Sequence, residues 1–196
     1  MPAWLERRAG SWEASAMPGR SPPRIELRAP TLADRDAFIA AMRASRQLHR
    51  PWLTPPMTAE AFDVLLRRVR DERSDPMLAC RRDNREIVGY FNISEIVRGP
   101  MQSAFLGYGA VAAHAGHGYM TEGMQLVLER AFTELRLHRL EANIQPGNSA
   151  SIALVRRCGF VHEGFSERYL KIAGRWRDHE RWAIRAEQWR SQRPRA

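Results

Sequence analysis

Two glycines, placed where an apolar strand gives way to an amphipathic helix, constrain the fold of this chain more than any other feature. Gly116 and Gly118 stand in the run His-Ala-Gly-His-Gly-Tyr, between a strand pattern that ends near Val111 and a helical pattern that reaches Leu135. The helical pattern keeps its apolar residues on one stripe and its glutamates on the other face, so this helix covers a sheet with one side. The junction therefore indicates a layered fold of sheet and helices.

The same junction is a candidate site for a pyrophosphate. The first N–H groups of a helix have no acceptor within the helix, and glycines before it leave no bulky side chain in the way. A Rossmann site would need a third glycine and an acidic residue at the end of the next strand, and a Walker loop would need Gly-Lys-Ser/Thr; the sequence has none of these. A plain strand-to-helix turn is the alternative for the glycines alone. A second segment, residues 148–160, strengthens the ligand interpretation.

Composition argues against several classes of protein. No apolar stretch approaches the ~20 residues that span a bilayer, no apolar segment follows Arg7 and Arg8 as a secretion signal requires, and the two cysteines lack metal-ligand spacing. We therefore expect a cytoplasmic protein with reduced thiols, no metal and no membrane contact. The net charge of +9 invites a nucleic-acid hypothesis, but of the 31 basic residues all except Lys171 are arginine, and they form no contiguous stripe. Weak attraction to ribosomal RNA is the more plausible use of that charge.

The order of patterns along the chain predicts one domain. Residues 1–23, rich in Ala, Gly, Ser, Pro and Arg, are expected to form a disordered leader, residues 24–190 the domain, and residues 191–196 a tail. Capping signatures at Thr31 and Thr58 start two helices, and two more are expected after the glycines and before Gly159. Strands are expected over 24–28, 77–81, 87–95, 103–111, 138–144, from 160 onward, and 175–184. This order gives a mixed α/β or α+β layer fold.

Seven short stretches, in this order and spacing, carry a resemblance to a known family. They are 96–99, 106–108, 116–122, 138–143, 146–148, 159–160 and 174–179. The chain resembles the GNAT N-acetyltransferase superfamily over residues 24 to about 189, and within it the Rim-type branch that acetylates ribosomal proteins at their N-termini. The resemblance implies a mostly antiparallel, twisted sheet of six to seven strands flanked by about four helices. It also implies acetyl-CoA in a V between strands 103–111 and 138–144.

The resemblance assigns a set of residues to the coenzyme. The family's pyrophosphate loop falls on residues 113–118, with backbone N–H groups as ligands, and a main-chain N–H near a bulge at Val111 would polarise the thioester carbonyl. Asn148 matches an asparagine that reaches the pantetheine arm, and it could also cap the next helix. The expected coenzyme residues are Val111, Ala113, His114, Gly116, His117, Gly118, Tyr119, Met120, Asn148 and Ser151.

The sequence departs from the family pattern in the loop and in the short helix that follows Asn148. Ala113 stands where Arg or Gln is common, which should weaken phosphate binding only modestly because the main chain makes most contacts. His114 and His117 could add positive charge there, or could be solvent-exposed loop residues. Val155 occupies the place of a tyrosine that protonates the departing thiolate in many members. Rim-type members use a serine instead, and Ser151 falls on that position, with an ordinary surface serine as the alternative.

The general base and the acceptor pocket are less well defined. Glu167 and Asp178, on the last two strands, are candidate bases, although acidic residues on an edge hairpin are usually only solvated. An N-terminal amine has a pKa near 8 and about a tenth of it is neutral at pH 7, so a weak base would suffice. Trp52 and Trp176 could wall the acceptor pocket or simply pack at its rim.

Several functions stay open on the sequence alone. The resemblance implies direct acetyl transfer to a primary amine, foremost the N-terminal α-amine of a ribosomal protein, in a monomer or homodimer. An acetyltransferase for a small amine (a polyamine, amino acid or aminoglycoside) is the first alternative. A non-catalytic module that binds CoA or docks on RNA is the second. Segments 43–57 and 165–180 together hold seven Arg or Lys residues and four aromatic residues against three acidic ones, which favours a peptide or an acidic acceptor over a polyamine.

Overall fold

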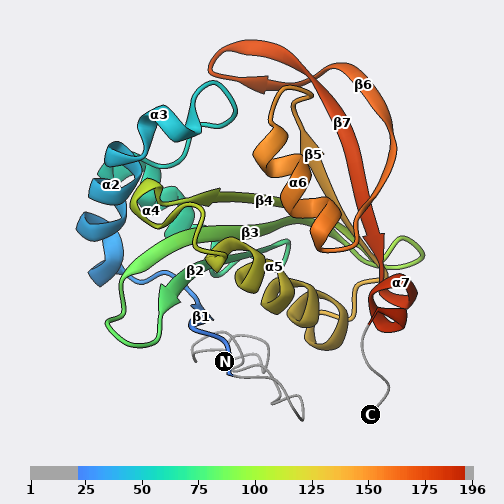
Figure 1. The fold of residues 1–196 in the computed structure, drawn as a ribbon, viewed down its shortest axis with the longest axis horizontal. Helices are drawn as coiled ribbons and strands as arrows, with labels where there is room; N and C mark the ends of the chain where they lie inside the picture. Colours follow the sequence, from blue (N-terminus) through green and yellow to red (C-terminus); the bar gives the residue numbers. More distant parts are fainter. Residues whose placement is uncertain (1–21, 193–196) are drawn as a thin grey trace.

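The computed structural model describes residues 22–192, which form one seven-stranded sheet with helices on both faces (Figure 1). The expected leader lies outside the described residues except for its last two prolines, and the tail except for its first two residues. The strand order is β1-β2-β3-β4-β5-β7-β6. The strands are β1 (Ile25–Arg28), β2 (Ser74–Arg81), β3 (Ile87–Val97), β4 (Ser103–Ala110), β5 (Arg139–Ile144), β6 (Val161–Ile172) and β7 (Arg175–Arg185).

The four predicted helices are present, and the structure adds the short elements α3, η2 and α7. Asn148 and Thr58 accept hydrogen bonds from the helices they precede, as N-caps do. The helical elements are η1 (Leu32–Asp34), α2 (Arg35–Ala44), α3 (Arg46–His49), α4 (Ala59–Arg68), η2 (Ala112–His114), α5 (Tyr119–Glu129), the π-helical turn η3 (Arg130–Glu134), α6 (Ser149–Arg157) and α7 (Ala186–Ser191). None of the helices within residues 22–192 has the length and apolar character needed to cross a bilayer.

Strand β2 shows how the sheet separates two cores. Its side chains alternate, so Met77 and Ala79 pack into the core beneath α5 while Leu78 and Cys80 pack into the core beneath α2 and α4. The larger core continues through α6 to the β5–β7 side of the sheet. The predicted α+β architecture with a mostly antiparallel sheet is confirmed.

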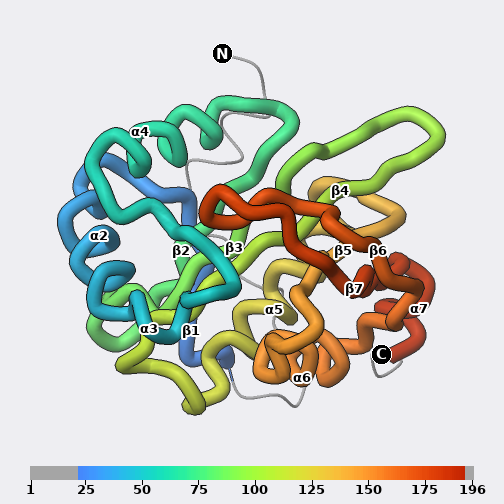
Figure 2. Tube along the Cα trace, turned by 90° about the horizontal axis from the view of Figure 1, so that it is seen from above, coloured from blue at the N-terminus to red at the C-terminus, as the bar shows by residue number. Residues whose placement is uncertain are grey.

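The sheet opens between β4 and β5. These two strands run parallel and pair only through Ser103–Arg139, Ala104–Leu140 and Phe105–Glu141, whereas all other neighbouring strands pair antiparallel. Beyond Phe105 the strands diverge, which is the splayed V that the resemblance implies. Figure 2 shows α5 and α6 side by side near the end of this opening.

Strand β2 begins three residues earlier than predicted, because a distant arginine neutralises the buried charge of Asp75. Asp75 and Pro76, residue types that are depleted in strands, directly precede the predicted strand. In the structure the Asp75 carboxylate is buried against the Arg130 guanidinium, with Arg130 Nε 2.6 Å from Asp75 Oδ2. The partner lies 55 residues away, so no local pattern could show that Asp75 belongs to a strand.

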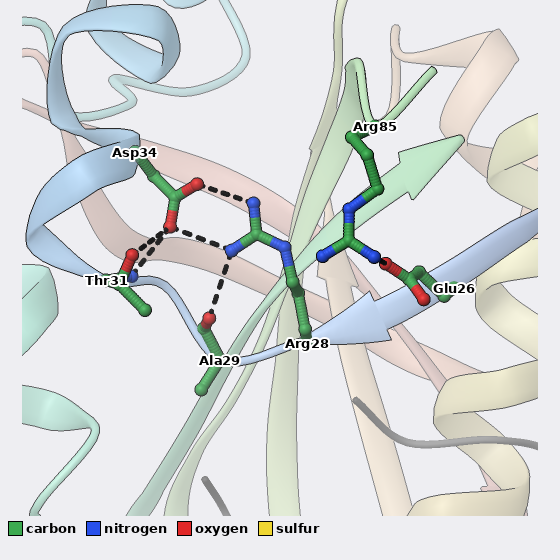
Figure 3. Close-up of polar contacts among 6 residues, drawn as sticks. All are labelled: Glu26, Arg28, Ala29, Thr31, Asp34 and Arg85. Atoms are coloured by element: carbon green, nitrogen blue, oxygen red, sulfur yellow. Dashed lines mark hydrogen bonds and ion pairs between the residues drawn. The ribbon is translucent and has the colours of Figure 1, made fainter. Parts of the chain in front are cut away.

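A second ion pair joins β1 to the first helices (Figure 3). The Arg28 guanidinium donates to both oxygens of Asp34, at 2.8 and 2.5 Å, and the Thr31 N–H and hydroxyl each donate to Asp34 Oδ2 at 2.8 Å. Burial acts to raise the pKa of Asp34, but the bonds from Arg28 and Thr31 outweigh it and hold that pKa below its usual value. On the neighbouring turn of the sheet, Arg85 pairs with Glu26 at 2.7 Å.

We expect Asp34→Asn to lower the free energy of unfolding by about 2 kcal/mol, because Arg28 loses a charged acceptor in a partly buried place. The lowered pKa of Asp34 means that its contribution is present above the ordinary carboxyl pKa of about 3.9 and fades as the pH falls through the folded-state value. Denaturant unfolding at pH 7 and in the acid range measures both effects. Asp36→Asn is the matched control, since the Asp36 side chain is 93% exposed. Equal stability of the two variants at pH 7 would contradict this role.

Candidate active site

A cleft of about 1190 Å³ lies where β4 and β5 diverge. The two strands form its floor, the glycine-rich turn and α6 form one end, and the loop after α3, helix α4 and the β6–β7 hairpin form the other end. Figure 2 shows the tip of this hairpin reaching over the sheet toward the loop after α3. The cleft therefore brings together segments from four separate parts of the chain.

The glycine-rich turn presents bare backbone donors. Gly116 and Gly118 have φ angles of 82° and 84°, a left-handed conformation that favours glycine, and Gly118 is the N-cap of α5. Within the described residues, no acceptor is found for the N–H groups of residues 116–120. These donors lie where the sequence predicted a pyrophosphate site, and their role as ligands stays a prediction.

Arg24, at the start of β1, fixes the shape of this turn. Its Nη2 donates to the His117 carbonyl at 2.8 Å, while its Nε and backbone N–H donate to the Glu122 carboxylate at 2.7 and 2.9 Å. The guanidinium also lies 4.6 Å from the centre of the Tyr119 ring. The sequence predicts Arg24 only as the first residue of a strand, since its two partners lie more than ninety positions away.

The two loop histidines differ in position. The His114 ring meets the edge of Tyr119 and lines the cleft, with its Nε2 3.7 Å from Glu86. The exposed His117 ring is stacked with Tyr119, and its Nδ1 lies 3.0 Å from the Ala115 carbonyl. Of the two histidines, only His114 lines the cleft.

The main-chain donors of β4 that face the cleft are not those that the sequence predicted. The Val111 N–H donates to the Val88 carbonyl at 2.9 Å, so it is engaged within the sheet. The expected bulge near Val111 is also wrong, because pairing with β3 is continuous from Ala110 back to Phe105 and the irregularity lies between Ser94 and Val97. Since neighbouring residues of a strand point their backbone groups to opposite sides, the N–H groups of Tyr108 and Ala110 face the cleft. Ala113 is exposed and lies outside the lining.

A hydroxyl pair occupies the middle of the cleft. Ser151 Oγ, in the first turn of α6, lies 2.6 Å from the hydroxyl of Tyr108 on β4. The Ser151 N–H donates to Asn148 Oδ1 at 3.2 Å, so Asn148 caps α6 and keeps its amide N–H groups available. Burial raises the pKa of Tyr108, which keeps the phenol protonated. Tyr108 was not predicted as a site residue, although it lies in one of the stretches that carry the resemblance.

Only one of the two predicted tryptophans lines the cleft. Trp52 lines the cleft, and its carbonyl accepts from Gln145 Nε2 at 2.9 Å. A methyl group on Gly147 would come within 3.0 Å of the Trp52 ring, so a glycine there lets the ring sit close to β5. Trp176 is 62% exposed near the hairpin tip and lies outside the lining, where the hairpin instead contributes residues 170–172.

Neither predicted base reaches the cleft. Glu167 and Asp178 are exposed and outside the lining, and Asp178 Oδ1 accepts from the Arg168 N–H at 2.8 Å across an irregular stretch of the β6–β7 pairing. That irregularity and the alternation of strand side chains direct both carboxylates away from the cleft. Among the described residues, the lining contains no aspartate or glutamate at all.

His179 takes the inward position beside Asp178. Its side chain is 2% exposed and lines the cleft, and its Nδ1 lies 2.9 Å from the Arg177 carbonyl. Since a carbonyl can only accept, Nδ1 carries the ring proton and Nε2 keeps its lone pair. Burial lowers the pKa of His179, against smaller opposite effects of the Arg177 bond and Asp178, so the ring is neutral at neutral pH.

Residues 24–161 match the family model of the GNAT acetyltransferase domain. The chain belongs to the GNAT family. A ribosomal protein uS5-alanine N-acetyltransferase from Escherichia coli is 36% identical over 107 residues, 55% of each chain. A spermidine N(1)-acetyltransferase from Vibrio cholerae is 25% identical over 75% of this chain and 85% of its own length. The structure of Mycobacterium smegmatis RimJ in complex with CoA-disulfide is similar with a TM-score of 0.77 and 29% identity, covering 84% of this chain and 83% of RimJ.

The family assignment confirms the resemblance that the sequence carried, including relatives from the ribosomal-protein branch. The chain spans about half the length of several of the curated relatives that it matches. In this GNAT domain the glycine-rich turn, the N-cap Asn148 and Ser151 line one cleft. Within the described residues no cluster of three or more metal-ligating side chains is present.

We expect Gly118→Ala to weaken the binding of coenzyme A about tenfold, because a side chain in the left-handed conformation costs roughly 1–2 kcal/mol and the loop would shift its N–H donors to relieve it. The new methyl group would also lie 3.3 Å from Arg24 Nη2. Titration calorimetry measures the affinity. Gly174→Ala is the matched control, since Gly174 has a φ of 80° with no atom nearby and lies on the distant hairpin. The same loss in both variants would show that general strain is responsible.

Proposed function

We propose that this protein transfers an acetyl group from acetyl-CoA directly to the N-terminal α-amine of a protein, with a ribosomal protein as the acceptor. The observation that carries the proposal is the cleft between β4 and β5, which has bare N–H donors at one end, the Tyr108–Ser151 pair in the middle and no carboxylate along its lining. The named relatives support the same class of reaction. Such an acceptor would place the protein in the cytoplasm.

The residues present fit acetyl-CoA. The N–H groups of residues 116–120 would hold its diphosphate, and Arg157, which lines the cleft 3.4 Å from Thr121 Oγ1, would add a positive charge at that end. The cleft-facing N–H groups of Tyr108 and Ala110 and the free amide of Asn148 would hold the pantetheine arm and the thioester carbonyl. The bound thioester supplies an acetyl carbon that is activated toward amines.

Two groups of the chain would move the protons. His179 Nε2 would take a proton from the acceptor amine as the nitrogen–carbon bond forms and the carbon–sulfur bond breaks. The Ser151 hydroxyl, backed by the protonated Tyr108, would give a proton to the departing thiolate. A phenol thus reaches the serine from β4, although α6 carries Val155 in place of the family's tyrosine.

A polyamine acceptor fits this cleft poorly. A polyamine keeps one or more ammonium groups while another is acetylated, and each needs an anionic partner or water when it leaves solution. The described lining offers no carboxylate for that purpose. A peptide N-terminus brings only the one amine, which reacts in its neutral form.

The direct test combines purified protein, acetyl-CoA and a panel of acceptors, with free CoA measured as the product. Mass spectrometry of N-terminal peptides from cells with and without the gene then identifies the natural acceptor. We expect CoA release with peptides that carry a free N-terminus and much less with spermidine. Turnover of spermidine at the higher kcat/KM would overturn the proposal.

We expect Ser151→Ala and Tyr108→Phe each to lower kcat roughly tenfold or more, since each removes part of the proton supply to the leaving thiolate. The affinity for coenzyme A should change little, because the backbone donors stay in place. Steady-state kinetics and calorimetry separate the two quantities. Ser149→Ala, which removes an exposed hydroxyl two positions away, is the matched control. An unchanged kcat in both site variants would remove the pair from the mechanism.

We expect His179→Asn to change the pH profile of kcat/KM as well as its size. The pKa of His179 is lowered, so the ring acts as a base at neutral pH and loses activity only as the pH falls below its usual range near 6.5. A plot of log kcat/KM against pH should have a slope of one where only the acceptor amine is protonated. For the unaltered protein the slope should rise to two in the acid range, where His179 is protonated as well, whereas the variant should keep a slope of one. His162→Asn, at an exposed position outside the cleft, is the control. Identical profiles would exclude His179 as the base.

A further inference from the structure

We infer that the preferred acceptor is acidic, with carboxylates close behind its N-terminal residue that Arg68 and Lys171 recognise. This inference rests on the proposed function and narrows its substrate class. The evidence is the distribution of charge along the cleft. The described lining contains three side chains that are always positive, Arg68, Arg157 and Lys171, and no negative one.

The three cations divide between the two ends of the cleft. Arg157 belongs to α6, beside Thr121 at the start of α5, and so lies at the end that has the bare N–H donors. Arg68 ends α4 and Lys171 lies near the end of β6. These two stand on different walls of the acceptor end, which also includes the Trp52 loop.

Both acceptor-end cations lack a carboxylate partner among the described residues. Other arginines of this protein form ion pairs with carboxylates, as Arg24, Arg28 and Arg139 do. Arg68 and Lys171 are exposed and no ion pair involves them. Their charge is therefore available to a ligand.

The surroundings of Arg68 and Lys171 suit an acceptor peptide whose first residue is short and apolar and whose next residues are negatively charged. The same walls also contain the apolar side chains of Leu53, Val64, Leu170 and Ile172. A peptide bound there would therefore meet two positive charges on an otherwise apolar surface. Two positive groups beside a low-dielectric wall attract an anionic chain and repel a cationic one, in both the rate and the strength of association. An acidic stretch after the first residue would thus favour binding while the reacting amine stays neutral.

Three peptides test the inference. They share an N-terminal alanine and differ only at positions 2 to 5, which carry glutamate, glutamine or lysine. With two exposed ion pairs available, we expect kcat/KM to be about five- to tenfold higher for the glutamate peptide than for the glutamine peptide, and lowest for the lysine peptide. The difference should shrink between 50 and 500 mM salt, roughly as screening of exposed charges requires.

Charge reversal provides the second arm. The double variant Arg68→Glu with Lys171→Glu should invert the order of the three peptides. The matched control is Arg67→Glu with Arg175→Glu, which changes the net charge equally at exposed positions outside the lining. Calorimetry with coenzyme A confirms that each variant is folded.

The outcomes separate the two levels of the proposal. Acetylation of all three peptides at equal rates, or an order that the double variant leaves unchanged, would overturn the inference and leave the proposed function standing. No CoA release with any peptide, in a protein that binds coenzyme A, would overturn the proposed peptide acceptor itself.

Discussion

The early end of the pairing between β4 and β5 determines most of the site. Backbone groups that leave a sheet need other partners, or they cost stability. The chain limits that cost because each strand keeps its other neighbour, β3 for β4 and β7 for β5. At the far end of β4 the first helices supply the missing bonds: His49 Nε2 donates to the Ala110 carbonyl, and Ser45 Oγ accepts from the Ala112 N–H, each at 2.8 Å. The opening is therefore a supported feature of the fold, which leaves the backbone of Tyr108 free for a ligand.

Arginines connect the layers around this opening. Arg130 reaches from the end of the long helical segment to Asp75 on β2, Arg28 joins β1 to the turn before α2, and Arg24 joins the start of β1 to α5. The Arg28 and Arg130 guanidinium groups each contact both oxygens of their carboxylate, so these two connections fix an orientation as well as a distance. Several of the 31 basic residues thus have a structural use that composition alone does not show.

Local patterns predicted what depends on neighbours in the sequence. The glycine-rich turn, the N-caps at Thr58 and Asn148 and the mixed layer fold all follow from propensity, capping and periodicity, and the structure confirms them. The family resemblance further predicted the coenzyme, acetyl-CoA, and the Rim-type branch of the family. The predicted bases lie outside the cleft for a reason that acts at longer range: the irregular pairing of β6 with β7 places Asp178 outside the lining and its neighbour His179 within it. The Val111 N–H points toward β3 because of strand parity, which the sequence does not display. Tyr108 was missed because its partner Ser151 lies 43 residues away.

The hold of Arg24 on the glycine-rich turn links two events that look unrelated along the chain. The Arg24 side chain contacts the carbonyl of His117 inside the turn and the carboxylate of Glu122 inside α5, while its backbone directly precedes β1. A ligand that stabilises the turn through this contact also stabilises the first residues of the strand. By linkage, fraying of the strand weakens ligand binding by the same coupling free energy. The edge strand β1 and the glycine-rich turn are therefore coupled through Arg24, and a ligand bound at the turn would change the order of the strand.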